Sequence, residues 1–304
     1  MNRRSLLGGV AIAGAGTALA AASGQSKGAP PTSSSRPPFV TTKDGIRLFV
    51  QDWGTGRPVI LLSAWTFNSS VWGSYIAALN AAGFRSIAPD RRGHGRSDMP
   101  MSGYDLDTLT DDVAAVIEQR DLKDAVLLAH SMGTIEAVNY LARYGSARIA
   151  KLILAAPTTP YLVQTGDNPD AVPRPMIDAQ TQTIAADYPK WIADNEAPFF
   201  TPDTPMETRA WIKAMMLSVA LPVALACRAT ISSADLRAQV ARIDRPTLIL
   251  HGSKDASAPL ALTGAKTAKL IKRSKFVVYE GAPHALTLTH RERFMGDVLS
   301  FIAA

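Results

Sequence analysis

Cysteine is almost absent from this chain of 304 residues, since Cys227 is the only one. An intramolecular disulfide is therefore impossible, and the surrounding letters ALACRAT indicate a helix on which Cys227 is a small buried residue rather than a reactive thiol. Basic runs with interleaved aromatic residues are also absent, although the formal net charge is +6, and this argues against nucleic-acid binding. With 47% hydrophobic residues, the chain suits one sizeable domain with its own core.

The N-terminus lacks the long apolar run that a membrane-spanning helix needs. Residues 1–22 instead contain paired arginines, Arg3 and Arg4, followed by a short Gly/Ala-rich stretch with an A-x-A cleavage site. This pattern predicts a twin-arginine-type signal peptide, and therefore a periplasmic or secreted protein without stable membrane association after cleavage. An uncleaved membrane anchor is the alternative. Residues 23–37 are rich in Ser and Pro and are predicted to form a flexible linker.

Strand-like and helix-like segments alternate over residues 38–304. The runs RPVILLS, FRSIAPD, KDAVLLAHS, IAKLILAAP, RPTLILHG and KFVVYEG are short and apolar, as expected for strands covered on both faces. Parallel strands need crossover helices, so the alternation predicts an α/β fold with an open, mostly parallel sheet flanked by helices. The alternation stops at about residues 158–233, a block with prolines, aromatics and helical segments. We interpret this block as a cap inserted beyond the strand ends, where active sites form.

Three residues that can form a hydrolytic triad each follow a predicted strand. Ser131 lies in LLAHSMGTIE, Asp255 in HGSKDASAP and His284 in YEGAPHALT. A triad needs a nucleophile, a histidine base and a carboxylate that orients the base. Because the carboxyl ends of parallel strands meet at one edge of a sheet, all three can converge there. The alternatives are a buried or capping serine, a carboxylate that caps a loop or helix, and a surface histidine.

The segment around Ser131 predicts a nucleophile elbow, a very tight turn from strand to helix. The serine of such a turn has a strained backbone, and the residues two before and two after it are crowded. Gly133 satisfies the second of these positions, and Ala129 adds only one methyl group at the first. The following helix directs free N–H groups and its positive dipole end at the site. Structural roles are predicted for the other histidines, and His130 should point the other way along its strand.

The chain resembles the α/β-hydrolase superfamily over nearly everything after the linker, and within it the arylesterase and cofactor-free haloperoxidase group. The stretches that carry the resemblance are IAPDRRGHGRSDMP, DLKDAVLLAHSMG, RPTLILHGSKDASAP and VVYEGAPHALTLTHRERFMGDVLSFI. The resemblance implies Ser131 as nucleophile, His284 as base, Asp255 as its partner, and a helical cap between the middle strands. It also implies an oxyanion hole of two backbone N–H groups, one from Met132 and one from the loop after VILLS.

That loop departs from the family pattern. Most members have His-Gly after this strand, whereas this chain has Ser63-Ala64 and then Trp65, whose N–H becomes the second expected donor. Losing the glycine narrows the range of backbone conformations that the loop can adopt. Losing the histidine removes a hydrogen-bond partner that braces the loop, a role that the Ser63 hydroxyl can take instead. Since each oxyanion donor contributes about 3 kcal/mol, the site is expected to be weaker than usual or shaped for an unusual substrate. Perhydrolase members often have proline at the next position, so Thr66 favours simple hydrolysis.

The cap block is rich in large apolar side chains and is expected to contribute to a largely apolar pocket. Most of these side chains are equally compatible with packing of the cap against the core. No cationic pair in the block indicates a phosphate or polyanion pocket. The residues predicted to line the pocket are Ala64, Phe67, Trp191, Phe199, Trp211 and Met215.

The leading hypothesis is an exported serine carboxylic-ester hydrolase that cleaves a small or medium apolar ester or lactone. It needs no metal or other cofactor, because Ser131, His284 and Asp255 carry the chemistry. A cofactor-free perhydrolase or haloperoxidase with the same triad is the first alternative, and a C–C bond hydrolase is another. The altered Ser63-Ala64 loop leaves open a ligand-binding protein on a hydrolase scaffold with slow turnover. The sequence predicts no particular oligomeric state.

Overall fold

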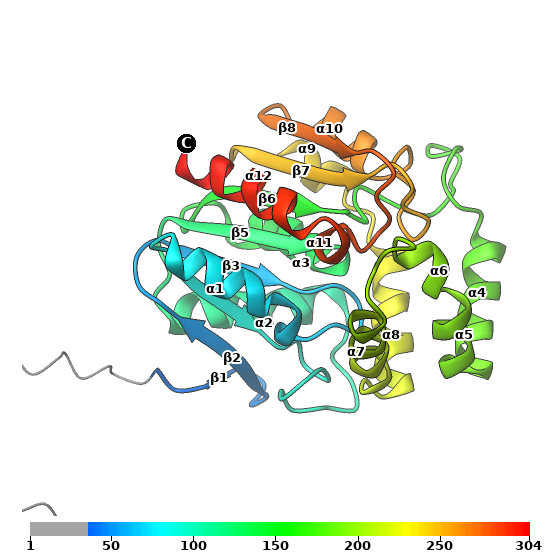
Figure 1. Cartoon of the computed structure of the whole chain (residues 1–304), viewed down its shortest axis with the longest axis horizontal. Helices are drawn as coiled ribbons and strands as arrows, with labels where there is room; N and C mark the ends of the chain where they lie inside the picture. The colour runs from blue at the N-terminus through cyan, green and yellow to red at the C-terminus, as the bar shows by residue number, and fades with distance from the viewer. Residues whose placement is uncertain (1–35) are drawn as a thin grey trace, which may run out of the picture. The chain divides into compact units, whose positions relative to one another are not determined.

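The computed structural model describes residues 36–304, so the predicted signal peptide and most of the predicted linker lie outside the described residues (Figure 1). Export by a twin-arginine-type signal therefore stays a prediction. The strands are β1 (Phe39–Thr41), β2 (Arg47–Trp53), β3 (Pro58–Leu62), β4 (Arg85–Pro89), β5 (Ala125–His130), β6 (Ile149–Ala155), β7 (Thr247–Gly252) and β8 (Ser274–Tyr279). The helices are η1 (Ser69–Trp72), α1 (Gly73–Ala81), α2 (Leu106–Gln119), α3 (Met132–Tyr144), α4 (Arg174–Ala186), α5 (Tyr188–Asp194), α6 (Glu196–Phe199), α7 (Met206–Leu217), α8 (Leu221–Ser233), α9 (Arg237–Ala241), α10 (Gly264–Leu270), α11 (Leu286–Thr289) and α12 (Arg291–Ala303).

The strands form one sheet in the order β1-β2-β4-β3-β5-β6-β7-β8. The pairs β1–β2 and β2–β4 are antiparallel, and all the other neighbouring pairs are parallel. This arrangement confirms the α/β fold with a mostly parallel sheet that the alternation predicts. The central strand β5 is buried along its whole length, because helices cover both faces of the sheet there.

Two layers of helices cover the sheet. Helix α1 packs beside α12 in one layer, and α2, α3, α9 and α10 are linked by contacts in the other. Helix α2 shows why these segments are helical. Asp105 caps its first turn by accepting a hydrogen bond from the Thr108 N–H, and its apolar residues recur at helical spacing. Among the apolar residues at this spacing, Leu109, Val113, Val116 and Ile117 are buried and Leu106 is half-buried.

The block at residues 158–233, which the sequence analysis interprets as a cap, contains helices α4 to α8 and joins β6 to β7. In Figure 1 these helices lie beyond the arrowheads of the parallel strands, at the end of the sheet where the strands finish. Within residues 36–304 no single helix has the length and composition of a membrane span, and α7 and α8 pass that test only as a pair bent by 93°.

Candidate active site

Ser131 occupies the turn between β5, which ends at His130, and α3, which begins at Met132. Its backbone has φ 52° and ψ −117°, a conformation that residues other than glycine rarely adopt. A Cβ atom at Gly133 would lie 2.8 Å from the carbonyl oxygen of Leu62 and 2.9 Å from its Cβ, so α3 can approach β3 this closely only with glycine. These features give the tight, strained turn that the sequence predicts.

A continuous chain of hydrogen bonds joins the three predicted triad residues. The Oγ of Ser131 lies 2.8 Å from Nε2 of His284, and Nδ1 of His284 lies 2.7 Å from Oδ2 of Asp255. The other carboxylate oxygen, Oδ1, accepts hydrogen bonds from the N–H groups of Ser257 at 2.9 Å and Ala258 at 2.8 Å. With the carboxylate ionised, Nδ1 is the donor, so Nε2 can accept the proton of the serine hydroxyl. The geometry permits nucleophilic attack by Ser131.

Asp255 faces a second imidazole, that of His251, for which the sequence indicates only a structural role. Nε2 of His251 lies 3.1 Å from the same Oδ2 that binds His284. A Cβ atom at Gly264 would collide with Nδ1 of His251, so the glycine makes room for this ring. Burial by itself raises the pKa of Asp255, but the charge on His284 and the hydrogen bonds from both imidazoles outweigh it and hold the pKa well below its usual value. The carboxylate therefore stays ionised at neutral pH.

The Ser63 hydroxyl braces the loop after β3. The Ser63 Oγ donates to the carbonyl of Asn68 at 3.3 Å and accepts from Nε1 of Trp72 at 3.0 Å. Bracing by Ser63 is thereby confirmed. The backbone of this loop is nevertheless strained at Thr66, which has φ 61°. The Thr66 hydroxyl donates to the carbonyl of Trp65 at 2.6 Å.

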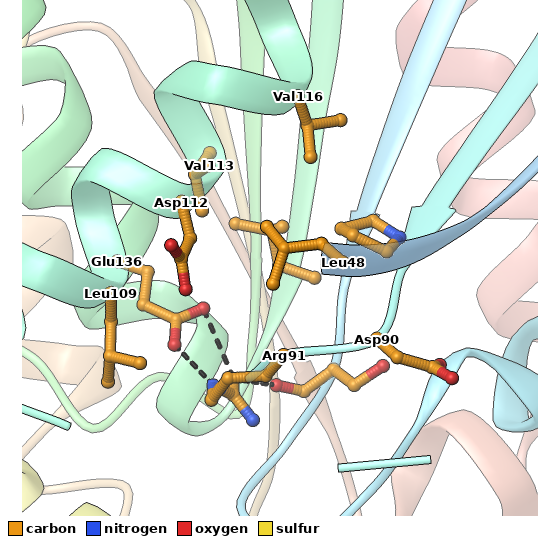
Figure 2. Close-up of a pocket in the computed structure, with 11 residues that line it drawn as sticks. Leu48, Asp90, Arg91, Leu109, Asp112, Val113, Val116 and Glu136 are labelled. Atoms are coloured by element: carbon orange, nitrogen blue, oxygen red, sulfur yellow. Dashed lines mark hydrogen bonds and ion pairs between the residues drawn. The ribbon is translucent and has the colours of Figure 1, made fainter. Parts of the chain in front are cut away.

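A buried ion pair supplies a second brace for this loop. Nη2 of Arg91 donates to the carbonyl of Ser63 at 2.8 Å, and Nη1 donates to that of Ala64 at 3.3 Å. Glu136, on α3, holds the guanidinium through Nε at 2.5 Å and Nη2 at 3.1 Å, as Figure 2 shows. The pair adjoins a cavity of about 20 Å³, which has room for about one water molecule rather than a substrate. Its effect is to fix the loop to the helix that begins at the elbow.

The two backbone N–H groups proposed for the oxyanion hole, those of Trp65 and Met132, make no hydrogen bond within residues 36–304. The N–H of Met132 is free because it belongs to the first turn of α3. The indole of Trp65 is fixed to the cap, since its Nε1 donates to the carbonyl of Ala224 at 2.8 Å and its ring centroid lies 5.6 Å from that of Trp191. Both N–H groups remain available to a ligand.

A cavity of about 350 Å³ opens beside Ser131 and His284, between the sheet end and the helices of the cap block. This volume suits a small or medium organic molecule. Its apolar lining near the serine comes from the loop after β3 and from the cap block. Of the residues predicted to line the pocket, Ala64, Phe67, Trp191 and Phe199 do so.

The sequence profile of the alpha/beta hydrolase family matches residues 59–297. The chain belongs to the alpha/beta hydrolase family. It is 34% identical over 274 residues to a non-heme chloroperoxidase, CPO-A1, of Kitasatospora aureofaciens, covering 87% of this chain and 99% of the relative. The bifunctional esterase/perhydrolase DCH of Acinetobacter calcoaceticus is also 34% identical over 274 residues, with the same coverage. Among solved structures, the esterase EaEST of Exiguobacterium antarcticum is similar with a TM-score of 0.85 and 29% identity, covering 88% of this chain and 100% of that one.

Two of the pocket predictions for this alpha/beta hydrolase are wrong. Trp211 and Met215 do not line the cavity; helix α7 instead turns Ile212, Lys213 and Met216 toward it. Each wrong residue precedes a lining residue by one position, which is about 100° of rotation around a helix. Trp211 is 42% exposed, whereas Met215 is buried with its Sδ 3.5 Å from the backbone nitrogen of Asn68.

The lining is largely apolar, as the sequence predicts, but it also contains charged and polar side chains. It includes Glu196, Lys213 and Arg228, together with the side chains of Gln180 and Ser232. Within the lining, the Lys213 ammonium and Glu196 offset each other at 2.6 Å; Oε1 of Glu196 also lies 3.4 Å from Nη1 of Arg209, which is outside the lining. The hydrolase therefore has an apolar region near Ser131 and a second region with charged groups.

Two buried histidines predict that this alpha/beta hydrolase loses stability as the pH falls. The pKa of His94 is lowered to about 3, mainly by burial and to a smaller extent by the charge of Arg91. The pKa of His130 is also lowered to about 3, mainly by burial and to a smaller extent by the charge of His284. The usual pKa is 6.5, so the unfolded chain binds more protons between pH 6.5 and 3. The neutral rings make their full contribution to the free energy of unfolding above pH 6.5. At pH 5 this contribution is smaller by about 2 kcal/mol per histidine.

Urea unfolding at pH 7.5 and at pH 5 measures this loss. His130, whose Nε2 contacts the carbonyl of His284 at 3.2 Å, is the histidine to replace. In His130→Phe the difference in unfolding free energy between the two pH values should shrink by about 2 kcal/mol. An unchanged difference in that variant would mean that His130 is not held neutral in the fold.

Proposed function

We propose that this alpha/beta hydrolase is a serine carboxylic-ester hydrolase that cleaves small or medium esters or lactones. The observation that carries the proposal is the unbroken hydrogen-bond chain from Asp255 through His284 to Ser131 at the wall of the 350 Å³ cavity. Ser131 attacks the carbonyl carbon while His284 takes its proton. The leaving alkoxide receives that proton, and an acyl-enzyme remains on Ser131. His284 then activates water, and hydrolysis of the acyl-enzyme releases the acid.

The proposed oxyanion hole consists of the backbone N–H groups of Trp65 and Met132. Their availability within the described residues supports this role, and so does the position of Met132 at the positive end of α3. The Arg91–Glu136 pair compensates for the missing His-Gly by tying the loop before Trp65 to the helix that carries Met132. We therefore attribute a working oxyanion hole to this loop, although its sequence departs from the family pattern.

Perhydrolysis is the second candidate function, and the names of two relatives favour it. Peroxide would then replace water as the acceptor of the acyl group on Ser131. Thr66 argues against it. The position has φ 61°, and proline is locked near −65°, so the proline expected of perhydrolases does not fit this loop as it stands.

A single panel distinguishes the two functions. We expect turnover of aryl esters, aliphatic esters and lactones at measurable rates in water, and negligible monochlorodimedone halogenation when acetate, halide and peroxide are supplied. Hydrolysis needs only the triad and the two N–H donors, and the loop has Thr66 where perhydrolases often have proline. Rapid halogenation with slow ester hydrolysis would reverse the ranking. Absence of both would favour a ligand-binding protein on this scaffold.

A further inference from the structure

Arg228 lines the cavity, and no acidic side chain within residues 36–304 pairs with it. It lies on α8, and its side chain is held at two of its three nitrogens by neutral groups on α4. Nε donates to Oγ1 of Thr181 at 3.2 Å, and Nη2 donates to Oε1 of Gln180 at 2.6 Å. Within residues 36–304 it has no ion pair, and Nη1 makes no hydrogen bond. One edge of a fixed guanidinium is thus left unsatisfied.

The charge of Arg228 is the one that the cavity lining does not offset. Lys213, the other cationic side chain in the lining, is paired with Glu196 at 2.6 Å. Burial lowers the pKa of Arg228, and no neighbouring carboxylate raises it again. A cation taken out of water without a counter-charge is costly. The contacts with Thr181 and Gln180 do not need a positive charge. A role in bridging α8 to α4 therefore does not explain why a charged arginine occupies this position.

Arg228 lines the same cavity as Ser131, and helix α8 connects it to the loop that carries Trp65. Ala224, whose carbonyl accepts the hydrogen bond from the Trp65 indole, precedes Arg228 by one helical turn, or about 6 Å along the helix axis. Trp65 in turn borders the cavity together with Ser131. A molecule whose ester group lies at Ser131 therefore needs only a short chain beyond Trp65 to reach the guanidinium.

We infer that Arg228 binds a carboxylate of the substrate, which makes the substrate a half-ester of a dicarboxylic acid or a lactone that carries a free carboxylate. The inference rests on the proposed function, because it places the scissile carbonyl at Ser131. A planar guanidinium matches a carboxylate in charge and shape. One uncompensated positive charge suits a monoanion, whereas a phosphate dianion would exceed it.

The test compares aryl half-esters of dicarboxylic acids, in a series of increasing chain length, with the same molecules capped as methyl esters at the free carboxyl. For the best-fitting length, we expect the wild type to have a kcat/KM roughly 10- to 100-fold higher for the acid than for its capped form. Arg228→Met should lower kcat/KM for the acid roughly 10- to 100-fold more than for the capped ester, and so remove this preference. Arg228→Lys should keep part of the preference, since lysine retains the positive charge but not the planar group that binds a carboxylate through two N–H donors.

Arg174→Met is the matched control. Arg174 lies on α4, its side chain is 62% exposed, and it pairs with Asp178, so the variant changes the formal charge equally without touching the cavity. Its acid preference should equal that of the wild type. A wild type that turns over capped and free esters alike, or an Arg228→Met variant that keeps the preference, overturns the inference while leaving the proposed function standing.

A binding measurement keeps the inference testable if no ester is turned over. Calorimetry of the half-ester acid with Ser131→Ala, and with the Ser131→Ala/Arg228→Met double variant, reports recognition without reaction. Affinity that falls roughly 10- to 100-fold only in the double variant supports carboxylate binding even if the proposed chemistry is wrong. Equal affinity, or no binding to either, contradicts it.

Discussion

Replacing Ser131 by alanine is expected to lower kcat for ester hydrolysis by about 10⁶-fold. The change removes the Oγ that lies 2.8 Å from Nε2 of His284, and with it the atom proposed to attack the carbonyl. KM should change little, because the cavity wall and the two N–H donors remain. The fold should tolerate the variant, since alanine adds no atom to the turn and the strained φ of 52° is imposed by the flanking strand and helix.

Initial rates on an aryl ester measure the effect, and a fluorophosphonate probe locates the nucleophile. The wild type should be labelled at Ser131 and the variant should not react. Ser232→Ala is the matched control, because Ser232 also lines the cavity but its Oγ donates to the carbonyl of Arg228 at 3.0 Å, away from His284. Activity in Ser131→Ala within about tenfold of the wild type would identify another nucleophile.

The fold could be predicted because its signals are local. Each buried strand is a short apolar run, and the helices between them require parallel pairing, as the sheet order confirms. Gly133 was also predictable, since a turn this tight leaves no space for a Cβ beside Leu62. The three predicted triad residues could be selected because each follows a strand. The structure brings their side chains together in the expected order.

The groups around the triad could not be predicted, because they are brought there by packing between distant segments. Arg91 is one of two adjacent arginines, and nothing local distinguishes the one that reaches Glu136 and the carbonyl of Ser63. His251 contacts Asp255 only because Gly264 leaves space for its ring. Arg228 lies in an apolar stretch that gives no sign of a cavity. Arg91 and Arg228 are defined by partners far away in the sequence, whereas His251 lies only four residues before Asp255 and its contact depends on the space at Gly264.

Helix α7 shows a different limit. Large apolar residues occur on several sides of it, so the sequence does not fix which side faces the cavity. The prediction selected Trp211 and Met215, whereas Ile212 and Met216 are the apolar residues of this helix that line the cavity. The rotation of α7 about its own axis is set by tertiary contacts, such as that between Met215 and the loop at Asn68. Amphipathic spacing predicts that a helix forms, but here it does not predict the orientation of that helix.

Asp255→Asn is expected to lower kcat by about 10⁴-fold, as in other Ser-His-Asp triads. The asparagine must place its carbonyl oxygen where Oδ1 accepts from the N–H groups of Ser257 and Ala258, because an NH₂ group there would face two donors. Its NH₂ group then takes the place of Oδ2, which lies 2.7 Å from Nδ1 of His284.

The consequence is a change of tautomer. Facing an NH₂ donor, Nδ1 of His284 must become the acceptor, so the ring proton moves to Nε2. Nε2 lies 2.8 Å from the Ser131 Oγ and can then no longer take the serine proton. The neutral amide also gives no charge stabilisation to the imidazolium. The same NH₂ group meets Nε2 of His251 at 3.1 Å, and this Nε2 must keep its proton for the carbonyl of Ala258 at 2.8 Å, so the second ring is displaced as well.

Steady-state kcat and the rate of fluorophosphonate labelling should both fall in Asp255→Asn, because both depend on activation of Ser131. Asp178→Asn is the control, since that carboxylate is half-exposed on α4 and pairs with Arg174 away from the cavity. A fall in labelling that follows kcat assigns the loss to the histidine base. Loss of kcat with unchanged labelling would instead place the role of Asp255 in a later step, the activation of water against the acyl-enzyme.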